Sequence, residues 1–366
     1  MKDLVSALFR SIPSGVGSSR REHKLSHAQV DQVLDQGAAW AVAQGLGRQE
    51  DLEHIEAGGR LRGPDPRAVS DRAKERGRAQ LGTLGSGNHF GEIQRVEEIF
   101  DQEAASALRL FHGQVVVSLH TGSRGLGYQV CDDHLQIMLE ASRRHRIELP
   151  DKQLCCAPLG SPEADRYLGA MAAAANFAFA NRQVMTDSVR RTFEQVLGRS
   201  QKDLALDVVY DVCHNVAKME THMVGGRPRR LCVHRKGATR AYPPGHPETP
   251  AAYRQVGQPV LIPGDMGRYS YVLVGTQAAM TETFGSTCHG AGRRMSRSAA
   301  ARGARGRPIV RELADRGIIV RSEGRNTLLE EIPEAYKDVA EVVDVVHGAG
   351  IARKVAKLVP MGVIKG

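Results

Sequence analysis

Apolar residues recur at intervals of three and four between positions 30 and 41, and this spacing predicts a helix with one buried face. Ser26 and Gln29 form a capping-box pattern before this helix, and Gly45 is a stop signal after it. A shorter amphipathic helix is predicted over 4–9. The N-terminal part of the chain is therefore expected to be largely helical.

The longest predicted helix starts at residues 161–162 and ends near Leu197, where Gly198 follows. Proline at the first helical position and glycine just past the last one are typical of these ends. The alanine-rich stretch over 170–180 predicts a tight contact between helices. Residues 58–80, in contrast, are polar and rich in Arg, Gly and Pro, which predicts an exposed connection.

Short runs of β-branched residues predict the strands of a sheet. The clearest is 115–119, which is expected to be a buried strand; others are expected at 206–212, 231–235, 259–262 and 269–275. After residue 289 the chain is expected to be helical and arginine-rich, with a final helix near 339–358. Since no repeat or linker divides the chain, we predict an α+β fold: one large domain over 1–366, with mixed sheets around a central metal and nucleotide cavity.

The composition is that of a globular protein with an excess of positive charge. Hydrophobic residues make up 41% of the 366 residues, enough for a substantial core. Lys and Arg number 50 against 41 acidic residues, which favours an anionic partner such as RNA, DNA or a nucleotide over a neutral one. A basic enzyme without a nucleic-acid partner is the alternative. No membrane-spanning run or signal peptide is visible, so we expect a soluble, cytoplasmic protein with no membrane partner.

The six cysteines do not form a metal-binding or disulfide pattern. None belongs to a Cys-x-x-Cys pair, so a zinc finger or a disulfide framework is not expected. Cys213 and Cys288 each precede a histidine, and we interpret both as packing residues.

Four histidines, at positions 89, 120, 214 and 289, stand in or beside loops rich in Gly, Ser and Asn. Imidazole binds divalent metals, and glycine lets a phosphate approach the backbone amides. His89, His120 and His214 could converge on one metal ion although they are far apart in sequence. The alternative for each is an ordinary core or surface histidine.

The surroundings of His289 suggest a phosphate site. Gly290-Ala291-Gly292 and Arg293-Arg294 follow it directly, so an anion could sit beside the imidazole. The histidine could attack a bound phosphate and form a phosphoramidate, or it could bind the phosphate without covalent chemistry. Arg124, in a Ser-Arg-Gly loop, could clamp a second phosphate. The arginines from 293 to 311 could follow a nucleic-acid backbone or form a solvated helix face.

Several motifs together resemble those of the RtcB-type RNA-splicing ligases. They are LGSGNHFGE at 84–92, LHTGSRG at 119–125, PGDMG at 263–267, HGAGR at 289–293, IPEAYKD at 332–338 and the Lys365-Gly366 ending. Because they occur in the family's order across essentially the whole chain, the chain is identified as a member of this family.

The resemblance implies a GTP- and Mn²⁺-dependent ligase. Such an enzyme joins RNA ends carrying a 3′-phosphate or 2′,3′-cyclic phosphate to 5′-hydroxyl ends in RNA splicing or repair. The resemblance implies that GTP guanylylates His289, that the GMP passes to the RNA 3′-phosphate, and that the 5′-hydroxyl displaces it. It also raises an archease as an activating partner, and leaves open whether this chain needs one.

The same resemblance assigns roles to residues of this sequence. Manganese would be bound by His89, His120 and His214. RNA phosphate would be held by Arg124 and Arg293. The nucleotide would be contacted by Asn88, Glu92, Asn215, Gly264, Asp265, Met266, Ala291, Gly292, Tyr336 and Lys365, with Glu92 and Lys365 at the guanine edge.

One feature departs from the family's pattern. Relatives carry an N-terminal section with an Asp-x-x-Cys-Gly motif whose Asp and Cys bind metal, and this sequence contains no such motif. We therefore expect a chain that lacks this section, and the second of the family's two Mn²⁺ ions is in question. Two alternatives to an active ligase remain. One is a nucleotide- or RNA-binding protein that has lost catalysis with the Asp and Cys ligands, and the other is a metal-dependent phosphohydrolase that uses the three histidines.

Overall fold

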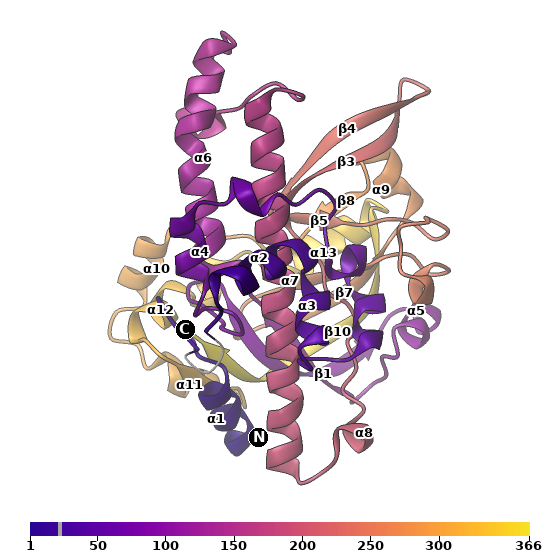
Figure 1. Cartoon of the computed structure of the whole chain (residues 1–366). Helices are drawn as coiled ribbons and strands as arrows, with labels where there is room; N and C mark the ends of the chain where they lie inside the picture. The colour runs from indigo at the N-terminus through magenta and orange to yellow at the C-terminus, as the bar shows by residue number, and fades with distance from the viewer. Residues whose placement is uncertain (21–23) are drawn as a thin grey trace.

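A six-stranded sheet is built around the C-terminal strand of the chain, β10 (Ala352–Lys365) (Figure 1). The computed structural model describes residues 1–20 and 24–366. The sheet order is β2 (Val115–His120), β1 (Phe90–Ile99), β10, β7 (Ser270–Gly275) and β6 (Pro259–Pro263), with β9 (Ile319–Ser322) pairing parallel to the end of β10. The mixture of helices and mostly antiparallel strands confirms the predicted α+β class.

The register of the sheet brings three chain segments together at one end of its strands. Phe90, the first residue of β1, pairs with His120, the last residue of β2. Gly91 pairs with Ile364 near the end of β10, which brings Lys365 to the same end. The loop before β1, the loop after β2 and the C-terminus therefore meet there.

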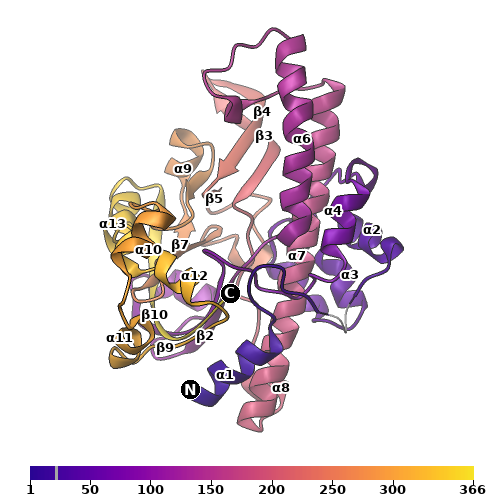
Figure 2. The ribbon, with the colours of Figure 1, turned by 90° about the vertical axis from the view of Figure 1, so that its left-hand side faces the viewer.

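A helical layer lies beside the sheet, organised by the long helix α7 (Pro162–Leu197) (Figure 2). Ser161 caps its start by accepting a hydrogen bond from the Ala164 N–H, and Gly198 ends it with φ of 61°. The alanine-rich part of α7 packs in one apolar cluster with α2, α4 and α6, which confirms the predicted helix–helix contact. The neighbouring helices are α2 (His27–Gln36), α3 (Ala38–Ala43), α4 (Asp71–Gly77) and α6 (Arg124–Arg144).

Smaller elements complete the fold. Two pairs of strands lie outside the large sheet: β3 (Asn215–Val224) with β4 (Arg227–Lys236), and β5 (Ala238–Arg240) with β8 (Ser286–Cys288). The remaining helices are α1 (Lys2–Ser11), α5 (Gln102–Ala107), α8 (Gln201–Leu204), α9 (Gln277–Glu282), α10 (Arg297–Gly303), α11 (Ile309–Asp315), α12 (Arg325–Glu330) and α13 (Val339–Gly348). Within the described part of the chain, no helix combines the length and apolar character needed to cross a membrane.

Three segments form a different type of secondary structure from the one that the sequence predicted. The expected final helix over 339–358 ends at Gly348, and Gly350, with φ of 71°, turns the chain into β10. The expected strand at 206–212 is irregular, with one bridge from Asp211 to Ile55. Residues 58–80 are not a plain connection, because they contain α4 and a short 3-10 turn.

Three further expectations need smaller corrections. The helix expected up to Gly45 breaks at Gly37, where an added Cβ would meet the Gly59 carbonyl oxygen at 2.1 Å. Strand 115–119 forms as β2 but is only half-buried, because it lies at the edge of the sheet. The chain after residue 289 is helical in α10–α12 but also contains β9.

The contact between α1 and the end of β10 tests the packing at the sheet edge. An added Cβ at Gly362 would lie 2.3 Å from Val5 Cγ2, so one element must move. We predict that Gly362→Ala lowers the free energy of unfolding by about 1–3 kcal/mol in denaturant titrations. Gly348→Ala is the control, since nothing lies within 4 Å of its added Cβ and its φ is not positive. Equal stability of the two variants would contradict this packing.

Candidate active site

Three imidazoles from distant parts of the chain face one another at the end of the sheet where β1 starts and β2 and β10 end. One ring nitrogen from each of His120, His214 and His289 lies within 4.8 Å of the others. The Nε2 atoms of His120 and His214 are 3.4 Å apart, and the rings of His214 and His289 stack with centroids 3.6 Å apart. The ring of His89 is adjacent, with its centroid 5.8 Å from that of His120. All four histidines singled out in the sequence therefore share one site, with His289 in the tightest group and His89 beside it.

Strand ends position these side chains. His120 ends β2, His89 precedes β1, His214 precedes β3 and His289 follows β8. Phe90 lies opposite His120 in the ladder, and its ring meets the imidazole edge-on with centroids 5.3 Å apart. The ladder thus fixes His120 relative to the segment that carries His89.

A buried amide in the middle of α7 ties two of the loops together. The Asn181 Oδ1 atom accepts hydrogen bonds from the backbone N–H groups of Gly82 at 2.7 Å and Thr83 at 3.1 Å. Its Nδ2 atom donates to the carbonyls of Thr83 and Gly122, each at 3.1 Å. Asn181 therefore joins the glycine-rich loop before β1 to the loop after β2.

The next residue of α7 ties in a third segment. The Arg182 Nε atom donates to Asp211 Oδ1 at 2.7 Å, and its Nη1 atom donates to the Thr121 carbonyl at 3.1 Å. Thr121 follows His120 directly, and Asp211 lies just before His214. One guanidinium therefore spans the segments that carry these two histidines.

A buried carboxylate holds the backbone immediately before His214. Glu56 accepts hydrogen bonds from the Cys213 N–H at 2.8 Å and from Lys218 Nζ at 2.6 Å, and it lies 3.4 Å from Arg240. Burial alone would raise the pKa of Glu56, but the charges of Lys218 and Arg240 lower it to about 2. The carboxylate therefore stays ionised and keeps these bonds.

Burial keeps the histidines neutral. Removal from water lowers the pKa of His289 to about 4, of His89 to about 3 and of His214 to about 2, and lowers the pKa of His120 well below its usual range. Neighbouring imidazoles and nearby cations act in the same direction. A neutral imidazole offers a nitrogen lone pair to a metal ion or to a phosphorus atom.

The spacing of the imidazole nitrogens fits a divalent metal ion. Two ligand nitrogens at about 2.1 Å from a tetrahedral metal are roughly 3.4 Å apart, and this matches the distance between the Nε2 atoms of His120 and His214. The Nδ1 atom of His289 is buried and has no hydrogen-bond partner among the described residues. Imidazole is also a suitable ligand for first-row divalent ions.

A buried acid and a buried base lie where β1 and β10 meet. Glu92 and Lys365 are each 4% exposed. Lys365 Nζ donates to the Gly87 carbonyl at 2.8 Å and lies 3.5 Å from Glu331, while Gln94 donates to Glu92 at 2.8 Å. Burial raises the pKa of Glu92 to about 8, against the opposing effect of the Lys365 charge. A carboxyl group and an amine are thus available beside the histidines for a polar ligand.

Arg293, predicted to hold phosphate, is bonded within the protein. It donates to Glu331 at 2.9 Å, to Tyr336 Oη at 3.0 Å and to the Glu330 carbonyl at 2.6 Å. Tyr336 in turn donates to Glu331. These bonds join the loop after His289 to the segment around Glu331, so Arg293 and Tyr336 position that loop.

Arg124, the other predicted phosphate ligand, faces the histidines. Its Nε atom donates to Thr83 Oγ1 at 3.1 Å, and its Nη1 atom lies 3.4 Å from His89 Nδ1. Its φ is 57°, a conformation that costs energy for a residue with a side chain. An added Cβ at Gly85 would lie 2.0 Å from Arg124 Nη1, so the glycine makes room for the guanidinium. Burial lowers the pKa of Arg124 to about 10, and the group remains cationic at neutral pH.

The remaining predicted nucleotide contacts come from several loops beside the histidines, and two of these loops touch. The Ala291 N–H donates to the Pro263 carbonyl at 3.3 Å, which brings that loop against residues 263–267. Gly264 packs so closely that an added Cβ would meet the Tyr269 carbonyl oxygen at 2.2 Å. Asp265 accepts from the Gly267 N–H at 2.9 Å, and burial raises its pKa. Met266 is buried, whereas three other predicted contacts are exposed: Asn88, Asn215 and Gly292.

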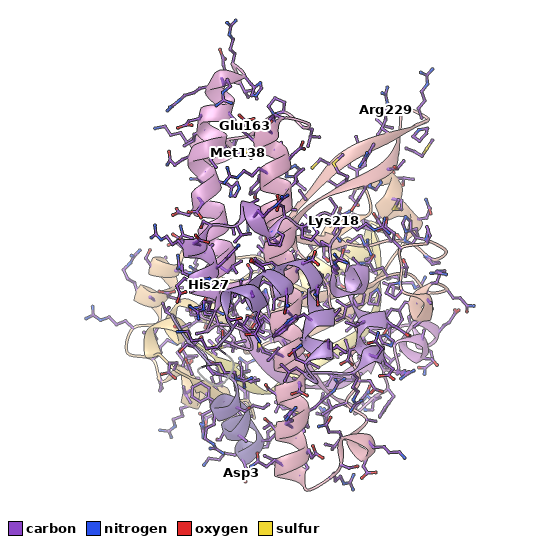
Figure 3. All side chains as sticks on the ribbon, in the orientation of Figure 1. Asp3, His27, Met138, Glu163, Lys218 and Arg229 are labelled. Atoms are coloured by element: carbon purple, nitrogen blue, oxygen red, sulfur yellow. The ribbon has the colours of Figure 1, made fainter. Side chains whose placement is uncertain are left out.

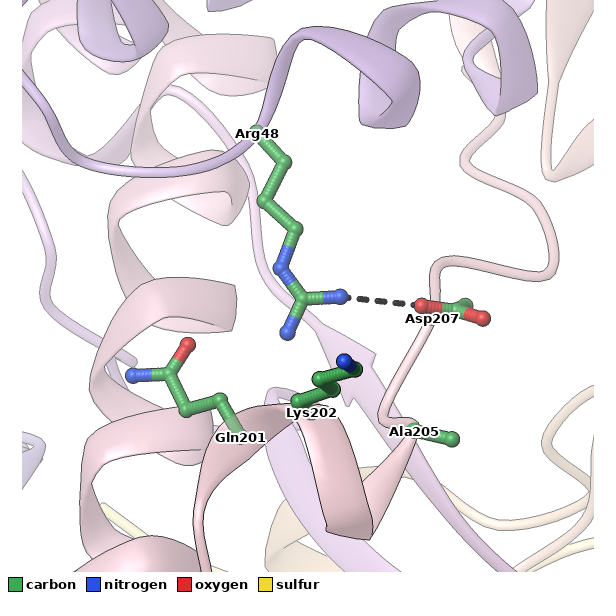
Figure 4. A pocket seen from close by; sticks show the side chains of 5 residues that line it. All are labelled: Arg48, Gln201, Lys202, Ala205 and Asp207. Atoms are coloured by element: carbon green, nitrogen blue, oxygen red, sulfur yellow. Dashed lines mark hydrogen bonds and ion pairs between the residues drawn. The ribbon is translucent and has the colours of Figure 1, made fainter.

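An open depression elsewhere on the surface does not belong to this site (Figure 4). It has a volume of about 420 Å³ and is lined by Arg48, Gln201, Lys202, Ala205 and Asp207. An ion pair of 3.0 Å between Arg48 and Asp207 occupies part of its wall. None of the four histidines lines it.

Sequence reasoning missed the residues that hold the histidines in place. Asn181, Arg182 and Glu56 contact the loops rather than a ligand, and no motif marks them. A usable signal exists for the first two, because an amide and a guanidinium stand among apolar residues such as Phe177, Phe179 and Val184 in the middle of a long helix. No comparable signal marks Glu56, which lies in a short irregular segment.

Comparison with known proteins gives matches over the whole of this chain. The family described as tRNA-splicing ligase RtcB matches residues 1–366. The tRNA-splicing ligase RtcB of Thermococcus kodakarensis is 55% identical over all of this chain and 76% of the relative. The tRNA-splicing ligase RtcB of Archaeoglobus fulgidus is 53% identical, again over 76% of its length. That of Pyrococcus abyssi is 57% identical over all of this chain but only 40% of the relative. The chain thus spans about three quarters of some relatives and about two fifths of others.

The clamp made by Asn181 can be tested by its removal. We predict that Asn181→Ala lowers the free energy of unfolding by about 2–4 kcal/mol, because it leaves several buried backbone groups unpaired. It should also speed amide hydrogen exchange at Gly82 and Thr83, measured by mass spectrometry of peptic peptides.

The matched control is Asn176→Ala. Asn176 lies on the same helix and is equally buried, but it binds Leu61, Leu34 and Asp35 rather than the histidine loops. Faster exchange at Gly82 in the control, or unchanged exchange in Asn181→Ala, would show that Asn181 is not the clamp.

Proposed function

The chain belongs to the RtcB family of tRNA-splicing ligases, and we propose that it joins RNA ends carrying a 3′-phosphate or 2′,3′-cyclic phosphate to 5′-hydroxyl ends, using GTP and Mn²⁺. The observation that carries this proposal is the convergence of His289 with His120 and His214. A nucleophile beside metal-binding imidazoles is the arrangement that nucleotidyl transfer requires.

The chemistry follows from the poor reactivity of a phosphate monoester. An RNA 3′-phosphate has no good leaving group, so a hydroxyl cannot displace anything from it. Transfer of GMP to this phosphate creates a phosphoanhydride, and GMP then becomes the leaving group. The enzyme must therefore hold a nucleotidyl group between GTP and RNA, and the half-buried, neutral His289 can do so.

From a 3′-phosphate end, three displacements complete the proposed reaction; a 2′,3′-cyclic phosphate is first opened by water, which attacks the phosphorus and breaks the bond to the 2′-oxygen, leaving a 2′-hydroxyl and a 3′-phosphate. A nitrogen of His289 attacks the α-phosphorus of GTP, a P–N bond forms, and pyrophosphate leaves. An oxygen of the RNA 3′-phosphate then attacks the same phosphorus, and the P–N bond to His289 breaks. Finally the 5′-hydroxyl oxygen attacks the 3′-phosphorus, the anhydride breaks, GMP leaves, and the hydroxyl proton passes to a base or to water.

His89, His120 and His214 are the proposed Mn²⁺ ligands. When bound, the ion would neutralise phosphate charge and align the attacking and leaving groups. The spacing of the His120 and His214 nitrogens supports their part of this assignment, while His289 completes the tight group and His89 lies beside it.

The proposed nucleotide pocket lies between β1, the end of β10 and the loop after His289. Glu92 and Lys365 would pair with the donor and acceptor edge of guanine, because they are buried and of opposite chemical character. The other proposed contacts are Asn88, Asn215, Gly264, Asp265, Met266, Ala291, Gly292 and Tyr336. Arg124 would hold phosphate, while the bonds of Arg293 favour a positioning role.

The wider setting of the proposal is RNA splicing or repair in the cytoplasm, with RNA as substrate and an archease as a candidate activating partner. A binding protein without catalysis is not favoured, because the match to named ligases covers the whole chain and His289 stands within the imidazole cluster.

A covalent adduct tests the role of His289. We predict that the protein incubated with GTP and Mn²⁺ gains the mass of one GMP, and that His289→Ala gains none. His27→Ala is the control, since His27 is an exposed histidine on α2, remote from the cluster. An adduct of parental yield in His289→Ala would exclude this residue as the nucleophile.

Metal affinity tests the ligand assignment without reference to catalysis. We predict that His120→Ala and His214→Ala each weaken Mn²⁺ binding at least ten-fold in calorimetric titrations, because each removes one ligand from a small set. His27→Ala again serves as the control. If both variants bind Mn²⁺ as tightly as the parent, the metal site lies elsewhere.

A further inference from the structure

A two-stranded ribbon leaves the body of the molecule directly beside His214. It consists of β3, β4 and the Gly225-Gly226 turn, and Figure 3 shows Lys218 near its base and Arg229 at its tip. Each strand has ten residues, a length of about 33 Å. The outer part is open to solvent: Met223 is 64% exposed and Val224 is 42% exposed.

The exposed part of the ribbon carries positive charge that the protein does not neutralise. Its one acidic residue, Glu220, is buried and bound by two nitrogens of Arg235, at 2.6 and 2.9 Å. Lys218 is paired with Glu56. The other cations have no ion-pair partner within 1–20 and 24–366, and they are Arg227, Arg229, Arg230 and Lys236.

One face of the ribbon is continuous with the active site. Side chains alternate between the two faces of a strand, so the register places Asn215 with Lys236, and Thr221 with Arg230, on the same face. Asn215 follows His214, and the charge of Lys236 acts on His289. This face, which we call the open face, therefore runs from the histidines to the tip.

The opposite face is closed near the base. There Arg235 donates to the carbonyl of Phe284 and to Ser286 Oγ, and His222 packs edge-on against the Phe284 ring. A long ligand that starts at His289 can thus follow the ribbon only along the open face.

We propose that the open face of the ribbon binds the RNA strand adjoining the end that is joined, through its phosphates and without sequence preference. The inference rests on the proposed function, which requires an RNA end to reach His289. Charge complementarity selects this occupant, because phosphates supply counter-ions for Arg230 and Lys236, the two unpaired cations that lie on this face. A second copy of the chain would bring the same positive surface, and like charges oppose such pairing. Exposed Met219 and Met223 on this face offer apolar contact to bases or riboses.

Two adjacent arginines provide a matched test, because Arg230 lies on the open face and Arg229 on the opposite one. Both are exposed. The experiment measures binding of a fluorescent single-stranded oligoribonucleotide to the full chain by anisotropy, at salt concentrations from about 50 to 200 mM. We predict that Arg230→Ala weakens binding roughly five-fold at the lowest salt and reduces the salt slope by about 0.7, the value for one lost phosphate contact. Arg229→Ala should change binding less than two-fold.

The outcomes separate this inference from the proposed reaction. GMP adduct formation with GTP should be unchanged in Arg230→Ala, since the ribbon tip is remote from His289. If the parent forms no adduct but Arg230→Ala still loses RNA affinity, the ribbon assignment stands and the ligase mechanism fails. Unchanged RNA affinity in Arg230→Ala, or equal losses in both variants, would overturn the ribbon assignment. A change in oligomeric state without a change in RNA affinity would overturn it as well.

Discussion

The candidate site depends on two adjacent polar side chains in the middle of α7, the buried Asn181 and the largely buried Arg182. Asn181 bonds the loops on either side of the first two strands, and Arg182 bonds the segments that carry His120 and His214. Four loops rich in small residues have little packing of their own, and loop ordering costs entropy. The helix supplies the missing constraint, because its backbone is rigid and its neighbours hold it firmly in the helical layer.

The same burial that orders the loops sets the chemistry of the site. Imidazoles withdrawn from water are neutral, so their nitrogens are free to bind a metal or to attack phosphorus. Anionic ligands are then attracted by the flanking cations, with Arg124 beside His89 and Lys236 near His289. The positive ribbon extends this attraction outward from the histidines. Positively charged groups therefore extend from the histidines along the ribbon, as the binding of an anionic RNA strand requires.

The sequence correctly predicted those elements whose limits depend on interactions between neighbouring residues, such as helix caps. The capping pattern at Ser26 and the proline-to-glycine limits of α7 are present in the structure, as is the strand that ends at His120. The expected helix over 339–358 was wrong in its second half, because pairing with strands on both sides outweighs an apolar, helix-like composition. The motifs identified the histidines, but their mutual distances and the clamps from α7 depend on contacts between remote segments. A single sequence can mark a polar residue within a helix, but it does not show which remote segments that residue joins.

The most direct test of the account is the position of manganese in crystals of the chain grown with the ion. Diffraction data collected at the manganese absorption edge would locate it by its anomalous signal. The account predicts a peak within coordination distance of ring nitrogens of His89, His120 and His214, next to His289. A peak only at another place, or none at saturating Mn²⁺, would contradict it.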